Sequence, residues 1–291
     1  MSSIIYKKNK KFYILLCLPA IVFYTLSVLY PLIGVTLPAS FFNWNILEGT
    51  KQFNGIENYI RLFKEEAFRD AMFFTLKLAV VTVLGSNILA FMVAYFLQAK
   101  IFAKGLSRAG FFIPNIINGI MVSFVWSFIF IQGIPILAKK IGFEKLASLS
   151  WFGTPSMAAV SVFIVTIWQG MGFIMIIYVA GMQSVSQELI EAAELEGCNR
   201  LQKVLYVVIP MMMPTITVCL FVSIAGAFKA FDIPFALTSG GPSRSTATVA
   251  LNIYDTAFTS FRTGYASAKS IVLFILRFLI NTLLRHLQQN F

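Results

Sequence analysis

The chain has 291 residues, of which 58% are hydrophobic and 12% are charged. Soluble domains carry about 25% charged residues, so this composition argues against an ordinary soluble protein. A net charge of +11 would suggest nucleic-acid binding in a soluble chain. Here the basic residues cluster at the ends of apolar segments, where they anchor and orient a membrane protein, so we expect no nucleic-acid partner.

Long uncharged stretches predict helices that cross a lipid bilayer. They lie between Lys11 and Glu48, Lys77 and Lys100, Arg108 and Lys139, Lys145 and Glu188, and Lys203 and Lys229. Each is long enough for the roughly 20 apolar residues that cross a bilayer as a helix, and hydrocarbon offers the backbone no other partner. With a weaker sixth segment, we predict an all-α membrane domain over 1–291 with spans at 12–36, 71–98, 108–131, 155–181, 206–230 and 264–287.

The connections between these spans differ in character. Lysines at positions 7, 8, 10 and 11 precede the first span and favour a cytoplasmic N-terminus. In the loop 37–70, the charged run up to Asp70 is typical of an amphipathic surface helix. Gly133 and Pro135 are expected to break the helix in the loop 132–154. The loop 231–263 is rich in Gly, Pro, Ser and Thr.

The loop 184–206 is unusually acidic for this chain. It holds Glu188, Glu191, Glu194 and Glu196, out of twelve acidic residues in all. Two short helices are expected there, with Ser184 and Gln187 forming a capping box for the first and Asn199 and Gln202 capping the second. Gly197 lies between them, where a positive φ is needed. Pro210 and Pro214 then indicate the start of the fifth span.

The string Glu191-Ala192-Ala193, followed by Gly197 and Ile209-Pro210, resembles the EAA loop of ATP-binding-cassette importer permeases. In that family the loop forms a coupling helix that docks into a cleft of a separate ATPase subunit. Two alanines give a narrow helix face, and a neighbouring carboxylate can pair with a group on the partner. The resemblance therefore implies an ATPase-coupling site made of Glu188, Glu191, Ala192, Ala193 and Gly197.

Other segments resemble the permeases that serve maltose, oligosaccharides and glycerol phosphate. They are 108–115, Trp168-Gln169-Gly170-Met171-Gly172-Phe173, 180–183, Phe231-Asp232 with 237–242, and 264–268. The resemblance implies the half of a heterodimer that corresponds to the larger maltose permease subunit, without its large external insertion. Ser186, Glu196 and Cys198 depart from the family pattern, which usually has proline, aspartate and a small residue there.

The resemblance also implies the fold and the partners. We expect the type I importer permease fold with both termini cytoplasmic, in a bacterial cell membrane. The expected partners are a second permease subunit, two ATP-binding cassette subunits and an extracellular solute-binding protein, with the loop 37–70 outside the cell. The glycine-rich segment 240–246 lacks the lysine and spacing of a phosphate-binding loop. The chain itself should therefore be no enzyme and hold no cofactor or metal, with ATP and Mg bound by the partner ATPases.

A candidate solute path lies on the fourth and fifth spans. Thr166, Gln169 and Phe173 are spaced i, i+3 and i+7, which places them on one helix face, and Gly170 beside them would allow close approach. Sugars need polar groups for their hydroxyls and an aromatic face for their C–H side. Ser223 on the fifth span is the best partner. A stripe of small and polar residues that only packs against another helix is the alternative.

Lys269 and Arg277 interrupt the last span, where a charge costs several kcal/mol unless it reaches water or a partner. We expect their charged ends to reach the membrane surface or to face the second permease subunit. Otherwise they line the solute path, and in that case Lys269 allows the solute to be an anion.

Three other functions stay open. They are a permease of the same superfamily for an amino acid, metal or polyol phosphate; an ion-coupled secondary transporter; and a membrane enzyme. The last lacks a catalytic cluster, since the single histidine, His286, lies near the end.

Overall fold

The computed structural model describes residues 10–98 and 104–289. Some residues named above lie outside the described part, namely Lys7, Lys8, Lys100 and the side chains of Lys10, Lys11 and His286. The chain divides into two compact units, each described by itself. Unit 1 is Met1–Glu65 with Ile253–Ile275, and unit 2 is Glu66–Asn252 with Leu276–Phe291.

The prediction of a helical membrane protein is confirmed. Over residues 10–98 and 104–289, the helices long and apolar enough to span a membrane are Leu15–Ala39, Glu66–Phe96, Gly119–Lys140, Pro155–Met182 and Thr263–Ile280. A sixth span is formed by Arg200–Met211 and Met213–Ala227 if this pair, bent by 76°, crosses as one.

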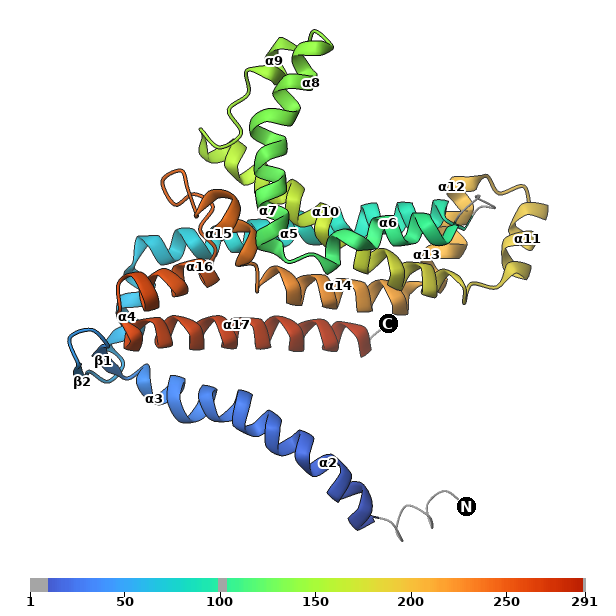
Figure 1. The fold of residues 1–291 in the computed structure, drawn as a ribbon. Helices are drawn as coiled ribbons and strands as arrows, with labels where there is room; N and C mark the ends of the chain where they lie inside the picture. Colours follow the sequence, from blue (N-terminus) through green and yellow to red (C-terminus); the bar gives the residue numbers. More distant parts are fainter. Residues whose placement is uncertain (1–9, 99–103, 290–291) are drawn as a thin grey trace. The chain divides into compact units, whose positions relative to one another are not determined.

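Unit 1 combines one long helix, a hairpin and part of the last span (Figure 1). Its elements are α2 (Lys10–Tyr24), the π-helix η1 (Thr25–Thr36), α3 (Leu37–Ala39), β1 (Phe42–Asn45), β2 (Thr50–Phe53), α4 (Glu57–Lys64), η4 (Asp255–Thr259) and the first half of α17 (Thr263–Gln289). The two strands are antiparallel, with Phe42 opposite Phe53. Apart from Ala39 at its end, almost every residue of the first span is exposed within the chain, which is expected of a helix that faces lipid or another subunit.

The start of α17 packs tightly against the hairpin. A Cβ atom on Gly264 would lie 2.0 Å from the carbonyl oxygen of Phe42, so only glycine fits there. The Asn58 side chain of α4 donates hydrogen bonds to the carbonyls of Ser40 (2.8 Å) and Phe42 (2.9 Å). These contacts join α4, β1 and α17 into one structure.

Lys269 is buried inside unit 1, with 1% of its surface exposed. Its Nζ lies 2.8 Å from Glu65 Oε2 and donates to Thr256 Oγ1 at 3.0 Å. It also lies 4.6 Å from the centre of the Tyr265 ring. The expectation that Lys269 snorkels or faces a second subunit is therefore wrong, because the chain supplies its own counter-charge. Arg277 is half-buried in unit 2, and its role stays a prediction.

Glu65, which caps the end of α4, is influenced by opposing effects. Burial alone raises the pKa of its carboxyl group. Hydrogen bonds from Lys269 and Tyr265, together with the positive charges of Lys269 and Arg61, outweigh burial and hold the pKa below its ordinary value of 4.5. Glu65 is therefore the ionised partner that compensates the buried ammonium group.

Unit 2 contains the remaining helices. They are α5 (Glu66–Phe96), α6 (Lys104–Ile116), α7 (Gly119–Phe128), η2 (Ile129–Gly133), α8 (Ile134–Lys140), α9 (Glu144–Ala147), α10 (Pro155–Met182), α11 (Gln187–Leu195), α12 (Arg200–Lys203), η3 (Val204–Val208), α13 (Ile209–Met211), α14 (Met213–Ala227), α15 (Asp232–Thr238) and most of α16 (Val249–Tyr254). The core lies where α5 packs on α10. Ala90 and Ala94 of α5 let Met175 and Tyr178 of α10 come close.

Three predicted boundaries are wrong. The span predicted at 108–131 breaks near Asn118, whose extended backbone ends α6 and whose side chain caps α7, so the spanning helix is Gly119–Lys140. Gly133 and Pro135 do not end this helix, because the wide π-turn of η2 carries the chain past a proline that has no N–H. The predicted surface helix up to Asp70 is divided at Glu65, where α4 ends before α5 begins.

Gly172 sets the distance between α6 and α10. A Cβ atom there would lie 2.0 Å from the carbonyl oxygen of Phe111, whereas one on Gly170 would find its nearest neighbour, Ser86 Oγ, at 3.7 Å. We expect Gly172→Ala to cost at least about 1–3 kcal/mol, because α6 must move away from α10. Gly170→Ala on the same helix is the matched control and should cost little. The measurement is the thermal unfolding midpoint of each purified variant, and equal midpoints would contradict this packing.

Candidate functional site

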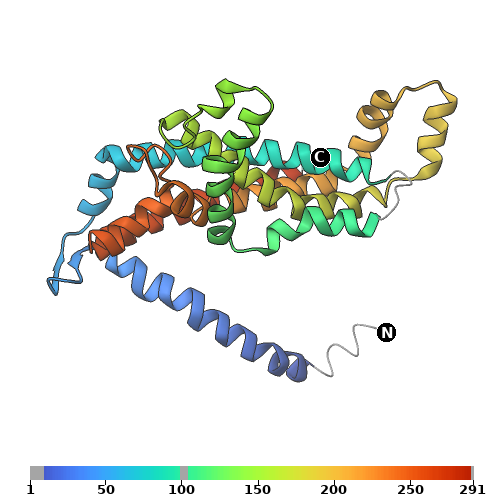
Figure 2. The same cartoon turned by 45° about the horizontal axis from the view of Figure 1, so that its top comes forward.

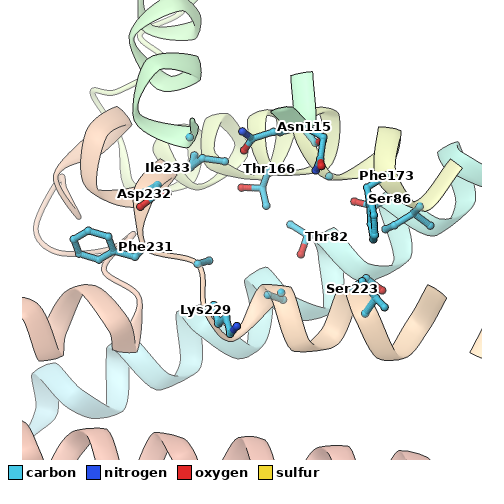
Figure 3. Close-up of a pocket in the computed structure, with 18 of the residues that line it drawn as sticks. Thr82, Ser86, Asn115, Thr166, Phe173, Ser223, Lys229, Phe231, Asp232 and Ile233 are labelled. Atoms are coloured by element: carbon cyan, nitrogen blue, oxygen red, sulfur yellow. The ribbon is translucent and has the colours of Figure 1, made fainter. Parts of the chain in front are cut away.

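Unit 2 contains a cavity of about 520 Å³ (Figure 3). Its walls come from α5, α10 and α14, from the break between α6 and α7, and from the connection between α14 and α15. All of the predicted path residues line it, namely Thr166, Gln169, Gly170, Phe173 and Ser223. The structure thus brings together residues of two spans that lie 50 or more positions apart in the sequence. We call this space the polar cavity.

The α10 wall is held by its polar side chains. Gln169 Nε2 donates to the carbonyl of Ile117 at 2.9 Å, and Asn115 Nδ2 donates to the Gln169 carbonyl at 3.4 Å. Gln169 therefore ties the break between α6 and α7 to α10. Thr166 Oγ1 donates its proton to the Val162 carbonyl, so toward a solute its oxygen can act as an acceptor. Phe173 leaves 42% of its surface exposed.

Ser223 belongs to a hydrogen-bond chain across three helices. The Tyr178 hydroxyl of α10 donates to Asn87 Oδ1 at 2.8 Å, and Asn87 Nδ2 of α5 donates to Ser223 Oγ at 2.9 Å. Ser223 in turn donates to the Cys219 carbonyl at 2.7 Å. This chain fixes where α14 meets α5 and α10, so the cavity wall is built on rigid helices.

Sequence reasoning missed several residues of the polar cavity. Thr82 and Ser86 of α5 line it, as do Asn115, Lys229 and Asp232. The i, i+4 spacing of Thr82 and Ser86 within an apolar span was a signal that could have found the first two. Within the chain, a Cβ atom on Gly170 would meet only ordinary contacts, and the tight packing of α10 against α6 is at Gly172. Close approach of a solute at Gly170 stays a prediction.

The acidic loop lies beyond the end of α10, and α11 projects away from the other helices of unit 2 (Figures 1 and 2). Glu188, Glu191 and Ala192 are exposed on α11, and Ala193 is half-buried. Gly197 has φ +80°, as predicted for the turn after α11. The loop therefore presents the Glu-Ala-Ala segment outward.

The two predicted caps in this loop have different outcomes. Asn199 and Gln202 form the reciprocal capping box of α12, which is confirmed. The first capping box is wrong, because Ser184 Oγ donates to the Gly181 carbonyl and α11 begins only after Ser186. Lys203 of α12 pairs with Glu194 of α11 and steadies the two short helices against each other.

Residues 101–291 match the family of binding-protein-dependent transport system inner membrane components. The chain belongs to this family. Two proteins named as transport-system permeases are similar to most of the chain. A probable starch degradation products transport system permease protein, AmyD of Thermoanaerobacterium thermosulfurigenes, is 33% identical over 97% of this chain and 96% of its own. The multiple sugar-binding transport system permease protein MsmF of Streptococcus mutans is 34% identical over 87% of each.

A solved structure shares the fold of this family member. It is that of a bacterial ABC transporter involved in the import of the acidic polysaccharide alginate, with a TM-score of 0.80 and 21% identity over 98% of this chain and 97% of that one. At this identity the likeness concerns the fold alone. Together with the family match, it identifies the chain as a multi-pass inner membrane component of a transport system.

Proposed function

We propose that this chain is the permease subunit of an ATP-driven importer that translocates a sugar or oligosaccharide delivered by an extracellular binding protein. The observation that carries the proposal is the polar cavity, where hydroxyl and amide side chains from α5, α6, α10 and α14 lie with the aromatic rings of Phe173 and Phe231. Such a lining suits a solute with hydroxyl groups on its edges and C–H groups on its faces. The sugar-transport names of AmyD and MsmF support the same solute class.

The coupling loop gives the proposed link to ATP. The face of α11 that carries Glu191, Ala192 and Ala193 would dock into a cleft of an ATP-binding cassette subunit, with Gly197 providing the turn and Glu188 an additional contact. ATP and Mg would be bound by two such subunits and not by this chain. Because ATP is cytoplasmic, the loop 184–206 and both termini would lie in the cytoplasm, and the loop 37–70 would lie outside with the binding protein.

Transport would follow from a shift between two states of the permease pair. Closure of the two ATPase subunits would move the coupling helices, and the spans would then open the cavity to the outside. ATP hydrolysis would return the spans to the state in which the cavity opens to the cytoplasm. The ATPase with ATP bound must bind the coupling helix more tightly in one state of the permease than in the other, and this preference must reverse without ATP. Only such a difference in affinity can shift the equilibrium between the two permease states. A second permease subunit would complete the cavity.

Gln169→Ala should reduce uptake at least tenfold, because it removes a cavity amide and the tie from α10 to Ile117. A lost hydrogen bond of about 1.4 kcal/mol corresponds to a tenfold change. Gln132→Ala is the matched control, since Gln132 is exposed on η2 outside the cavity lining. Initial uptake rates in vesicles, with complex yield measured in parallel, provide the test. Normal uptake by Gln169→Ala would remove this residue from the solute path.

A further inference from the structure

The polar cavity contains a pair of opposite charges that sequence analysis did not connect. Among the described residues that line it, Lys229 and Asp232 are the only ionisable ones. Both are exposed, and within the described part of the chain neither takes part in an ion pair. Lys229 lies on the connection after α14 and Asp232 at the start of α15, and Figure 3 shows Thr166 and Thr82 on the facing walls. The two charges are therefore available to a solute.

The position of Asp232 is set by backbone packing. A Cβ atom on Gly119, the first residue of α7, would lie 2.9 Å from Asp232 Cβ and 3.4 Å from its Oδ2. Glycine at 119 thus lets the start of α7 come against the start of α15. Lys229 lies just after α14 ends at Ala227 and three residues before Asp232. The chain holds both charges at one cavity without letting them neutralise each other directly.

Lys269 does not supply charge to this cavity. It is buried in unit 1 and compensated by Glu65, so it is not the residue that would attract an anionic solute. The charge that a solute meets in the polar cavity comes from Lys229 and Asp232 alone among the described lining residues.

We propose that Lys229 and Asp232 act together as a charge filter that selects an uncharged, hydroxyl-rich saccharide. A carboxylate accepts hydrogen bonds from hydroxyl groups, and an ammonium group donates to hydroxyl oxygens, so a neutral sugar satisfies both. A saccharide with a carboxylate is attracted by Lys229 but repelled by Asp232. A saccharide with a protonated amine is attracted by Asp232 but repelled by Lys229. The proposal rests on the proposed sugar-import function and narrows its substrate class.

The test uses the complete importer, reconstituted into vesicles with its binding protein outside and ATP inside. Uptake of maltose, maltotriose and raffinose is measured while a charged trisaccharide is enclosed in the vesicles, where the binding protein does not select it. The probes are trigalacturonate, which is anionic, and triglucosamine, which is cationic. Both reach the cavity from the side on which ATP acts.

The expected inhibition is reciprocal. Wild type should resist both probes. Asp232→Asn leaves only the positive charge, so trigalacturonate should inhibit it at a concentration at least tenfold lower than for wild type. Lys229→Gln leaves only the negative charge, so triglucosamine should inhibit it at a concentration at least tenfold lower. Asp70→Asn and Lys139→Gln, exposed outside the cavity lining, should behave as wild type.

Two failures can be told apart. If wild type imports a neutral sugar and the two cavity variants show the same inhibition as wild type, the charge filter is overturned and sugar import stands. The charge filter is also overturned if only one of the two variants assembles and that variant is inhibited by its probe at the same concentration as wild type. If wild type hydrolyses ATP but imports none of the three neutral sugars, the proposed function fails, and the filter fails with it.

Discussion

Glu65→Gln should lower the free energy of unfolding by about 2–3 kcal/mol, because it leaves the Lys269 ammonium group buried without a counter-charge. Breaking a fully buried pair in this way costs about 3–5 kcal/mol. The smaller value applies here because the Glu65 side chain keeps 30% of its surface exposed. Thermal unfolding of the purified chain, together with hydrogen exchange in the first half of α17, measures the loss.

A substitution of Lys269, the other member of the ion pair, provides the matched comparison for the loss of unfolding free energy. Lys269→Met replaces the buried ammonium group with an apolar side chain of similar length, and the exposed part of Glu65 can still be hydrated. We therefore expect Lys269→Met to cost clearly less than Glu65→Gln, and the double variant to recover most of the loss from Glu65→Gln. Equal costs for the two single variants would show that the ion pair is not what stabilises unit 1.

The pH dependence follows from the same pair. The pKa of Glu65 is lowered in the folded chain, so its stabilising effect is complete above the ordinary value of 4.5 and is lost as pH falls further through the folded-state pKa. Wild type should therefore lose more stability than Glu65→Gln on acidification below pH 4.5. Parallel pH curves for the two proteins would contradict this assignment.

Glu191→Lys should lower ATP-driven uptake at least roughly thirtyfold while leaving the chain folded. Glu191 is exposed on α11, where its Oε1 accepts a 3.3 Å hydrogen bond from Gln187. Reversal of its charge therefore disturbs little inside the chain. At a docked interface, however, losing one member of a buried charge pair costs about 2–5 kcal/mol, and 2 kcal/mol corresponds to roughly thirtyfold.

A charge reversal elsewhere on unit 2 separates docking from net charge. Glu144→Lys makes the same change of charge at an exposed residue of α9. Because α10 separates α9 from the loop 184–206, Glu144 would lie on the opposite side of the membrane from the proposed coupling loop. Glu144→Lys should keep uptake close to that of wild type. Loss of uptake in both variants would point to a general effect of charge and not to the coupling loop.

Much of the fold was accessible from sequence because hydrocarbon imposes strong rules. Charge-free stretches located the spans, and the positive φ of Gly197 and the Asn199 capping box followed from local backbone chemistry. The boundaries near Asn118 and Pro135 did not follow, because a capped break and a π-turn depend on how α6 and α7 pack, which local sequence does not reveal.

The site was predictable where one helix face carries it. The i, i+3, i+7 spacing on α10 was enough to group Thr166, Gln169 and Phe173, and all three line the polar cavity. Residues contributed by other segments, such as Ser86 and Asp232, depend on long-range packing. The buried pair of Lys269 and Glu65 joins residues about 200 positions apart in sequence, so no local pattern could predict it.

The most direct test of the proposed importer is co-purification of the tagged chain from its native membrane. We predict that wild type brings along an ATPase subunit and a second permease, and that Glu191→Lys retains the permease but loses the ATPase. If the chain purifies alone in both cases, coupling to ATP through α11 is contradicted.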